Sequence, residues 1–141
     1  MLRKATAEWN GGLKDGSGKI STDSGVLKDT QYSFSTRFED GIGTNPEELI
    51  AAAHAACYSM ALSGFLGRGG FTPTSIETKA VVHLEKKEDG FVIPNIDLET
   101  IADVPNISND EFQTIAKNAK EKCPVSQVLA GAEISLNAKL K

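Results

Sequence analysis

The sequence contains few of the residues that identify many common classes of protein. It has 2 cysteines, 2 histidines and 1 tryptophan in 141 residues, and the cysteines are not spaced as a CxxC motif. This set is too small for a zinc finger or a framework of disulfides. Positive charge is not in excess either, because the net charge is −4 and the pI is about 5.2. No basic surface for nucleic acid is therefore expected.

Long apolar runs are also absent. No segment approaches the roughly 18 uninterrupted apolar residues of a membrane span, and residues 1–8 lack the apolar centre of a secretion signal. We therefore expect a cytoplasmic protein without a membrane span, in a compartment where thiols stay reduced. The length fits one domain, residues 1–141, with an adequate core.

The main feature that is present is a long predicted helix over residues 46–66. Asn45 suits the N-cap and Pro46 the first helical position, while Glu47 and Glu48 favour the positive end of the helix dipole. Glu48 follows Asn45 by three residues, the spacing of a capping box. Alanine and other apolar residues occupy nearly every side of this helix, so we expect it to be enclosed, with a partner subunit supplying part of the cover.

Alternation of apolar and polar residues predicts strands at 4–9, 19–22, 32–38, 76–85, 91–104 and 134–140. Arg37 is expected on the less apolar face of the third strand, where pairing with Glu39 or Asp40 at the surface is the simplest interpretation. Asp89 and Gly90 predict a hairpin turn, and Pro94 in the returning strand predicts a bulge or an edge.

Two further helices are predicted near the C-terminus. Ser108 and Glu111 fit a capping box at the start of the first, and Pro124 opens a short second helix that extends to Ala130. The order β-β-β-α-β-β-α-α-β predicts an α+β fold in which antiparallel strands pack on a core helix.

The two cysteines are the candidates for chemistry. Cys57 lies inside the long helix, where apolar surroundings raise a thiol pKa. Cys123 lies at the predicted N-cap of the short helix beside Lys120 and Lys122, an environment that favours the thiolate. The residues alone therefore leave open which cysteine attacks first.

Three chemistries are compatible with these positions. His54 precedes Cys57 by three residues and could form a nucleophilic Cys-His pair for acyl transfer, although it could equally be a core histidine. His54, Cys57 and Cys123 could bind a metal, but this is one ligand short of a closed tetrahedral site. Cys57 and Cys123 could form a redox pair, provided that the fold brings them within disulfide distance.

Beyond these local patterns, the whole chain resembles the osmotically inducible protein C (OsmC) group of the OsmC/Ohr hydroperoxide reductases. The residues that carry the resemblance are 21–27 (STDSGVL), 36–39 (TRFE), 43–60, 70–76 (GFTPTSI) and 123–129 (CPVSQVL). These ordered blocks are spread over the whole chain.

The resemblance implies an OsmC-like fold, with antiparallel sheets wrapped around long central helices, in a tightly intertwined homodimer with active sites at the subunit interface. It implies a thiol peroxidase for oxidative or osmotic stress defence. Such an enzyme reduces organic hydroperoxides, and hydrogen peroxide less well, without metal, flavin or other cofactor. An external dithiol recycles it, and the related Ohr branch uses lipoylated proteins.

The resemblance also implies roles for four residues. Cys57 is the peroxidatic cysteine, Cys123 the resolving cysteine and Arg37 the activating cation, with Glu47 orienting Arg37. A straight helix separates Glu47 from Cys57 by about 15 Å. Either the helix breaks between them, or Arg37 and Glu47 of one subunit serve a cysteine elsewhere in the dimer.

An apolar wall, for which Phe38, Leu49, Ile50 and Phe65 are candidates, would favour alkyl hydroperoxides. The non-enzymatic alternative is a stress protein that binds an apolar ligand between its central helices.

Overall fold

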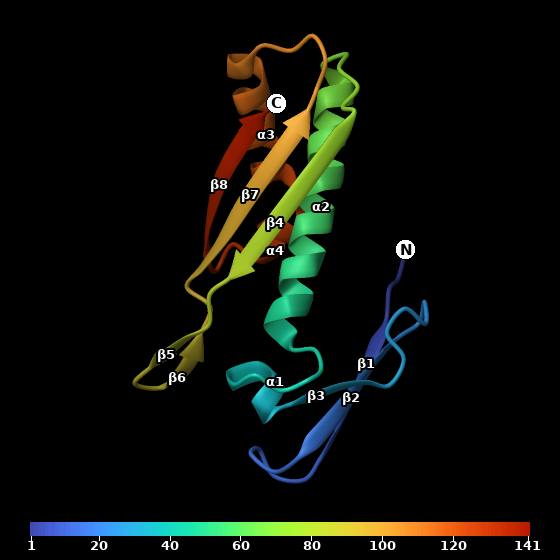
Figure 1. The fold of residues 1–141 in the computed structure, drawn as a ribbon, viewed down its shortest axis with the longest axis vertical. Coiled ribbons are helices and arrows are strands. Elements are labelled where there is room, and N and C mark those ends of the chain that lie inside the picture. The colour runs from blue at the N-terminus through green and yellow to red at the C-terminus, as the bar shows by residue number, and fades with distance from the viewer. The chain divides into compact units, whose positions relative to one another are not determined.

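The computed structural model describes residues 1–141 (Figure 1). The chain forms two compact units, Met1–Leu49 and Ile50–Lys141. The family resemblance noted above extends over both of them.

The first unit contains a three-stranded antiparallel sheet in the order β1-β2-β3. Its strands are β1 (Ala5–Asn10), β2 (Ser17–Thr22) and β3 (Thr30–Ser33). Every residue of β1 is exposed to solvent. The prediction of a half-buried strand is therefore correct in its position and wrong in its burial, because no layer within the first unit covers its apolar face.

The predicted strand over residues 32–38 is wrong after Ser33. Residues Phe34–Phe38 form a short helix, α1, for which Ser33 is the N-cap. The Ser33 hydroxyl accepts a hydrogen bond from the Thr36 backbone N–H, and the Thr36 hydroxyl accepts one from the Ser33 N–H. This local capping box starts a helix where the alternation of aromatic residues indicated a strand. Arg37 therefore lies on a helix.

Helix α2 (Pro46–Arg68) is continuous and close to its predicted bounds. The Asn45 side chain accepts a hydrogen bond from the Glu48 N–H at 2.8 Å and caps the helix as predicted. One stripe of the helix is fully buried and consists of His54, Tyr58, Leu62 and Leu66. The spacing of four residues places these side chains on a single helix face.

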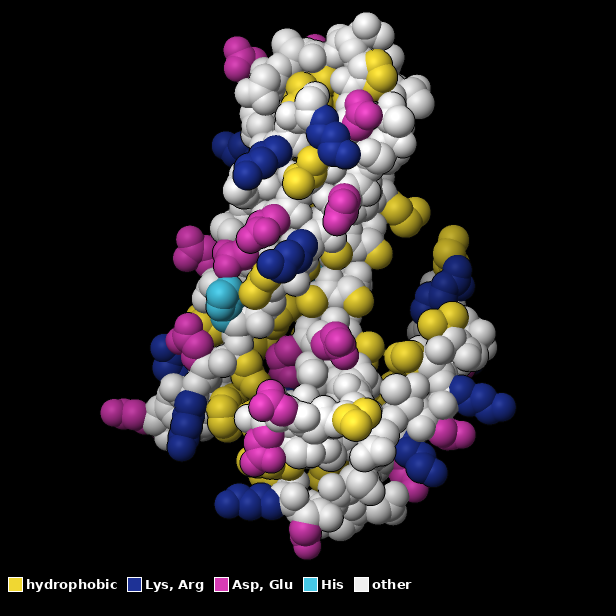
Figure 2. Space-filling model, in the orientation of Figure 1, with side chains coloured by type: hydrophobic (Ala, Val, Ile, Leu, Met, Phe, Trp, Pro, Cys, Tyr) yellow, Lys and Arg dark blue, Asp and Glu magenta, His cyan; other side chains and the backbone are white.

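The opposite face of α2 is exposed within the second unit and carries Ala52, Ala53, Ala56, Met60 and Gly64. Figure 2 shows apolar side chains at the surface along this helix. The second unit therefore encloses only one side of the helix, and the expectation that a partner subunit supplies part of the cover stays a prediction. By length and composition alone α2 could also cross a membrane, with a mean hydropathy of 1.5, but its buried stripe belongs to the core of the second unit.

The second unit contains a three-stranded sheet in the order β4-β7-β8. Its strands are β4 (Ser75–Val82), β7 (Asn95–Asp103) and β8 (Glu133–Leu140). The small hairpin of β5 (Glu85–Lys87) and β6 (Gly90–Val92) extends the β4–β7 pair. Two residues (83–84) lie between the paired residues Val82 and Glu85, whereas three (93–95) lie between their partners Val92 and Ile96. The returning strand therefore has one extra residue, as in a β-bulge, at the position of Pro94.

One pairing differs from the predicted antiparallel arrangement. β8 runs parallel to β7, with Ile96 opposite Ile134 and Leu98 opposite Leu136. The chain between these strands passes through α3 (Asn109–Lys122) and α4 (Pro124–Val128). A crossover of that length allows a parallel return.

The core of the second unit lies between one face of its sheet and the helices α2 and α3, which run beside the sheet in Figure 1. Leu98 and Ala102 of β7 contribute from the sheet, and Phe112 and Ala116 contribute from α3. Alternate residues of β7, such as Glu99, point to the opposite, uncovered face. The core also contains Cys123, at the junction of α3 and α4.

Candidate active site

The two cysteines meet in the second unit. Cys57 comes from the middle of α2, and Cys123 is both the C-cap of α3 and the N-cap of α4. Pro124 keeps Cys123 out of the helical conformation, so α3 ends and α4 starts at this residue. Both cysteines are free thiols, and their Sγ atoms lie 2.9 Å apart although 66 positions separate them in the sequence. The structure thus brings the redox pair together.

The two thiols have opposite pKa shifts. Burial raises the pKa of Cys57, and its contact with Cys123 raises it further. Burial alone would also raise the pKa of Cys123, but its interactions with Cys57, Ser126 and Val125 outweigh that effect and lower it. Within this unit the negative charge is therefore favoured on Cys123, in agreement with its predicted position at a helix start.

His54 is hydrogen-bonded to Ser126 and not to Cys57, the partner considered from the sequence. Its Nε2 atom lies 2.8 Å from the Ser126 hydroxyl, and its Nδ1 atom has no hydrogen-bond partner. Neither nitrogen therefore bonds Cys57, and the Cys-His nucleophilic pair is not formed. Burial lowers the pKa of His54, which favours the neutral ring. No group of three or more potential ligands is arranged for a metal ion.

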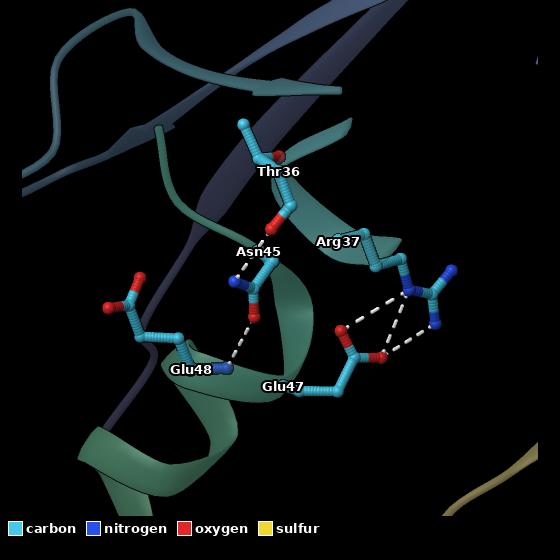
Figure 3. A network of polar contacts seen from close by, with 5 residues as sticks. All are labelled: Thr36, Arg37, Asn45, Glu47 and Glu48. Atoms are coloured by element: carbon cyan, nitrogen blue, oxygen red, sulfur yellow. Dashed lines mark hydrogen bonds and ion pairs between the residues drawn. The ribbon is translucent and has the colours of Figure 1, made fainter. Parts of the chain in front are cut away.

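The charged part of the candidate site lies in the first unit. The Arg37 Nε donates to the two carboxylate oxygens of Glu47 at 3.0 and 3.2 Å, and Nη2 donates to Oε1 at 2.7 Å (Figure 3). The Glu47 side chain is only 11% exposed, whereas 38% of the Arg37 side chain remains accessible. The carboxylate thus fixes the guanidinium by a bidentate contact and leaves part of it free. The predicted pairing of Arg37 with Glu39 or Asp40 is therefore wrong, because Arg37 pairs with Glu47.

The choice between Glu47 and Glu48 follows from the helix start. The Glu48 carboxylate accepts a hydrogen bond from the Thr44 hydroxyl at 2.8 Å, and its backbone N–H is bound by Asn45. The Asn45 amide also donates to the Thr36 carbonyl at 3.1 Å, which ties the start of α2 to α1. In Figure 3 the Glu47 side chain faces Arg37, and that of Glu48 points away from it.

A cavity of about 290 Å3 adjoins Arg37 within the first unit. Its lining is mostly apolar and aromatic, and consists of Trp9, Leu13, Tyr32, Ser33, Phe34, Arg37, Phe38 and Pro46. Phe38 is the only one of the four predicted wall residues in this lining. The Arg37 guanidinium lies 5.2 Å from the centre of the Phe38 ring, a cation–π contact.

Sequence reasoning missed several of these residues. Trp9 and Tyr32 flank Gly18 in the sheet, with ring centres 5.4 Å apart, and this contact depends on strand register. Ser126 could have been predicted from the sequence. It follows Cys123 by three residues at the start of a predicted helix, and from there its hydroxyl can reach the N-cap residue.

The comparisons with known proteins show the family of the chain. Residues 39–139 match the protein family described as OsmC-like protein. The chain is 55% identical over 139 residues to the protein named Peroxiredoxin OsmC of Escherichia coli strain K12, covering 99% of this chain and 96% of that one. It is also 29% identical over 115 residues to the organic hydroperoxide resistance protein OhrB of Bacillus subtilis, covering 81% and 82% of the two chains.

Solved structures show the same fold. The crystal structure of OhrB from Bacillus subtilis superposes with a TM-score of 0.68 at 28% identity, covering 98% of both chains. An OsmC-like protein of Mycoplasma pneumoniae gives a TM-score of 0.77 over 99% of this chain and 97% of that one. At 19% identity, this second likeness concerns the fold alone.

Proposed function

The chain belongs to the OsmC-like protein family, and we propose that it is a cysteine-dependent peroxidase that reduces organic hydroperoxides, and hydrogen peroxide less well. The observation that carries this proposal is the approach of the two free thiols to 2.9 Å. The names of its relatives support the same reaction, since one is a peroxiredoxin and another an organic hydroperoxide resistance protein.

In the proposed reaction the Cys57 thiolate attacks the terminal peroxide oxygen. The O–O bond breaks, the alkoxide leaves and takes a proton to become an alcohol, and Cys57 becomes a sulfenic acid. The Cys123 thiolate then attacks the Cys57 sulfur, hydroxide leaves as water after protonation, and a disulfide forms. An external dithiol reduces the disulfide by thiol–disulfide exchange and restores both thiols.

The first step requires Cys57 to be the thiolate, which its own unit disfavours. We assign to Arg37 the role of the missing cation, with Glu47 as the residue that orients it. The bidentate contact and the accessible part of the guanidinium support this assignment. An arginine near a buried thiolate stabilises its charge strongly where water is excluded.

We further propose that the working form is the intertwined homodimer, in which Arg37 and Glu47 of one subunit serve the Cys57 of its partner. Because α2 is continuous, the alternative in which the helix breaks between Glu47 and Cys57 is wrong. The exposed apolar face of α2 and the fully exposed β1 each lack a covering layer within their own unit, and Met60 on the α2 face is 78% exposed. Surfaces of this kind suit an obligate subunit interface.

The apolar cavity beside Arg37 favours alkyl hydroperoxides over hydrogen peroxide. Phe34 and Phe38 stack with ring centres 4.7 Å apart and form part of its lining. Burial of an alkyl chain there would add binding energy that hydrogen peroxide cannot gain. We propose a cytoplasmic enzyme of oxidative or osmotic stress defence, recycled by a dithiol, for which a lipoyl group is one candidate.

One assay tests the proposed function. The purified protein is mixed with an alkyl hydroperoxide and a small dithiol, peroxide loss is followed, and the oxidised protein is weighed by mass spectrometry. Catalytic peroxide loss together with an intramolecular Cys57–Cys123 disulfide is the expected result. Stoichiometric or absent peroxide loss would overturn the proposal and favour the non-enzymatic apolar-ligand interpretation.

A further inference from the structure

A buried polar chain runs from His54 to the two thiols. His54 is fully buried in the central stripe of α2, where the other three residues are Tyr58, Leu62 and Leu66. Its Nε2 atom is hydrogen-bonded to the Ser126 hydroxyl at 2.8 Å, whereas its Nδ1 atom has no partner. A histidine with one unpaired nitrogen costs stability at a site that an apolar side chain could fill. The peroxidase reaction proposed above assigns it no role.

The unpaired nitrogen indicates the tautomer of the ring. A buried N–H group without an acceptor is rare, whereas an acceptor without a donor is tolerated better. The proton of the neutral ring is therefore favoured on Nε2, leaving Nδ1 as a lone pair. In that tautomer Nε2–H donates to the Ser126 oxygen, and the Ser126 hydrogen is free to bond elsewhere.

The other partner of Ser126 is Cys123. Ser126 is the third residue of α4, whose N-cap is Cys123, and it is only 5% exposed. Its hydroxyl and its backbone N–H both lower the pKa of the Cys123 thiol. Because His54 occupies the hydroxyl oxygen, the hydroxyl hydrogen is available to the sulfur. All the donors in this chain are thereby aligned in the direction His54 to Ser126 to Cys123.

We propose that His54 and Ser126 are positioning residues that hold Cys123 as a hydrogen-bond-accepting thiolate for disulfide formation with Cys57. The proposal deepens the proposed function and rests on it. The donors are in place before the peroxide arrives, so Cys123 can ionise as soon as Cys57 has lost its negative charge by becoming a sulfenic acid. The sulfenic acid on Cys57 then has little time to react further.

The step balances without a new reactant. Cys123 releases its proton to solvent when it ionises, and Ser126 donates a hydrogen bond to the resulting thiolate. The thiolate forms the S–S bond with Cys57 as the S–O bond of the sulfenic acid breaks. Hydroxide leaves with the electron pair and combines with a proton to give water. In the reverse direction, the same donors stabilise Cys123 as the leaving thiolate when a dithiol attacks Cys57.

Few other titratable groups face Cys123. Cys57 and Tyr58 approach it from α2, and the Tyr58 hydroxyl donates to the Ala116 carbonyl at 3.4 Å. On α3, the Lys120 ammonium donates to the Ile134 carbonyl at 3.0 Å. Besides Cys57 and the Val125 backbone, Ser126 is therefore the residue that acts directly on the pKa of Cys123, and its hydroxyl can be removed by substitution.

The test uses pairs of substitutions that differ mainly in a donor. Ser126→Ala removes the hydroxyl and Ser126→Thr retains it. His54→Met removes the ring donor, whereas His54→Gln is similar in length and retains an N–H. Ser59→Ala is the matched control. Ser59 lies on α2, as His54 does, but its hydroxyl donates to the Thr78 hydroxyl at 2.8 Å and not to a thiol.

Two rates are measured after one equivalent of an alkyl hydroperoxide. Sulfenic acid formation is followed by trapping with a cyclic 1,3-dione, and disulfide formation is followed by the loss of two hydrogens in the mass. Ser126→Ala and His54→Met should slow disulfide formation on the order of tenfold and should not slow sulfenic acid formation. Ser126→Thr, His54→Gln and Ser59→Ala should stay close to the parent protein. Equal disulfide rates in all variants would overturn the proposal.

A second measurement separates this proposal from the proposed function. In a Cys57→Ser background the pKa of Cys123 is titrated by thiolate absorbance, which requires no peroxide reaction. Removal of the Ser126 hydroxyl should raise this pKa, whereas Ser126→Thr should not. A rise in the Cys123 pKa would support the role of His54 and Ser126 even in a protein that consumes no hydroperoxide. An unchanged pKa would overturn that role even in an active peroxidase.

Discussion

The two regions that carry chemistry in this chain control charge in different ways. Arg37 and Glu47 form a fixed ion pair whose cation is 38% exposed, and three charge-assisted hydrogen bonds determine its geometry. Cys57 and Cys123 have no charged partner in their own unit, and neutral donors determine which sulfur carries the charge. The dithiol region is thus prepared for disulfide formation, whereas attack on peroxide needs a charge that the dithiol region lacks.

This contrast assigns each of the two reaction steps to a different region of the molecule. The ion pair is assigned to the first step, at Cys57, and the neutral donors are assigned to the second, at Cys123. Substitutions in one region should therefore change one step and leave the other intact.

The largest effect is expected from Cys57→Ser, which removes the attacking sulfur. A serine hydroxyl is far less acidic and does not reduce peroxide, so turnover should fall by at least about 1,000-fold. Peroxide consumption with a dithiol measures it. Full peroxidase activity in this variant would overturn the assignment of Cys57, and a mass increase at Cys123 would instead make Cys123 the peroxidatic residue.

Cys123→Ser should separate the two steps. Cys57 is still oxidised once, but the sulfenic acid has no thiol beside it and accumulates or gains further oxygen. Mass spectrometry after excess peroxide should show a gain of about 32 Da, the mass of two oxygens in a sulfinic acid. A variant that turns over at the parental rate without a disulfide would show that Cys123 is not the resolving residue.

Arg37→Ala should affect the first step alone. Without the guanidinium the Cys57 pKa should rise and the rate of peroxide attack should fall on the order of 100-fold, while the rate of disulfide formation from the sulfenic acid is unchanged. Because the affected form is the thiolate, the defect should shrink as the pH is raised. Thiolate titration and single-turnover kinetics measure these effects.

The chain offers a matched control for this substitution. Arg68 lies 4.7 Å from the Phe65 ring, a stacking contact similar to that of Arg37 on Phe38. Arg68→Ala should leave both steps unchanged. An unaltered Cys57 titration in Arg37→Ala would count against the proposed role of the cation.

Glu47→Gln should have the smallest effect. The amide keeps the shape of the carboxylate and one acceptor but loses the charge that fixes both guanidinium nitrogens, so the rate of attack should fall by about tenfold. Glu48→Gln is the control, because the Glu48 carboxylate bonds Thr44 instead. Equal rates for the two variants would show that orientation by Glu47 contributes nothing to the reaction.

Much of the local structure could be predicted from short segments. Asn45 with Pro46, Ser108 with Glu111, and Asp89 with Gly90 correctly placed two helix starts and a hairpin, because each signal acts within a few residues. The alternation around Phe34 was misleading, because Ser33 and Thr36 form a capping box that outweighs a weak strand pattern.

The direction of β8 and the burial of β1 could not be predicted from such local patterns. Alternation in residues 134–140 identifies a strand but carries no information about its neighbour, so the parallel pairing with β7 was missed. Likewise, alternation in β1 predicts an apolar face, but only the presence of a second layer decides whether that face is buried.

The sequence by itself determined the family and the residue types of the site: two cysteines, an arginine and a glutamate after an Asn-Pro helix start. Only the tertiary structure decided which of them meet. Cys57 and Cys123 are 66 positions apart and approach to 2.9 Å because α2 and the α3–α4 junction pack into one core. Tertiary packing likewise placed Glu47 on Arg37 and Ser126 between His54 and Cys123. Caps and turns act through the nearest residues, whereas these contacts depend on how distant segments pack.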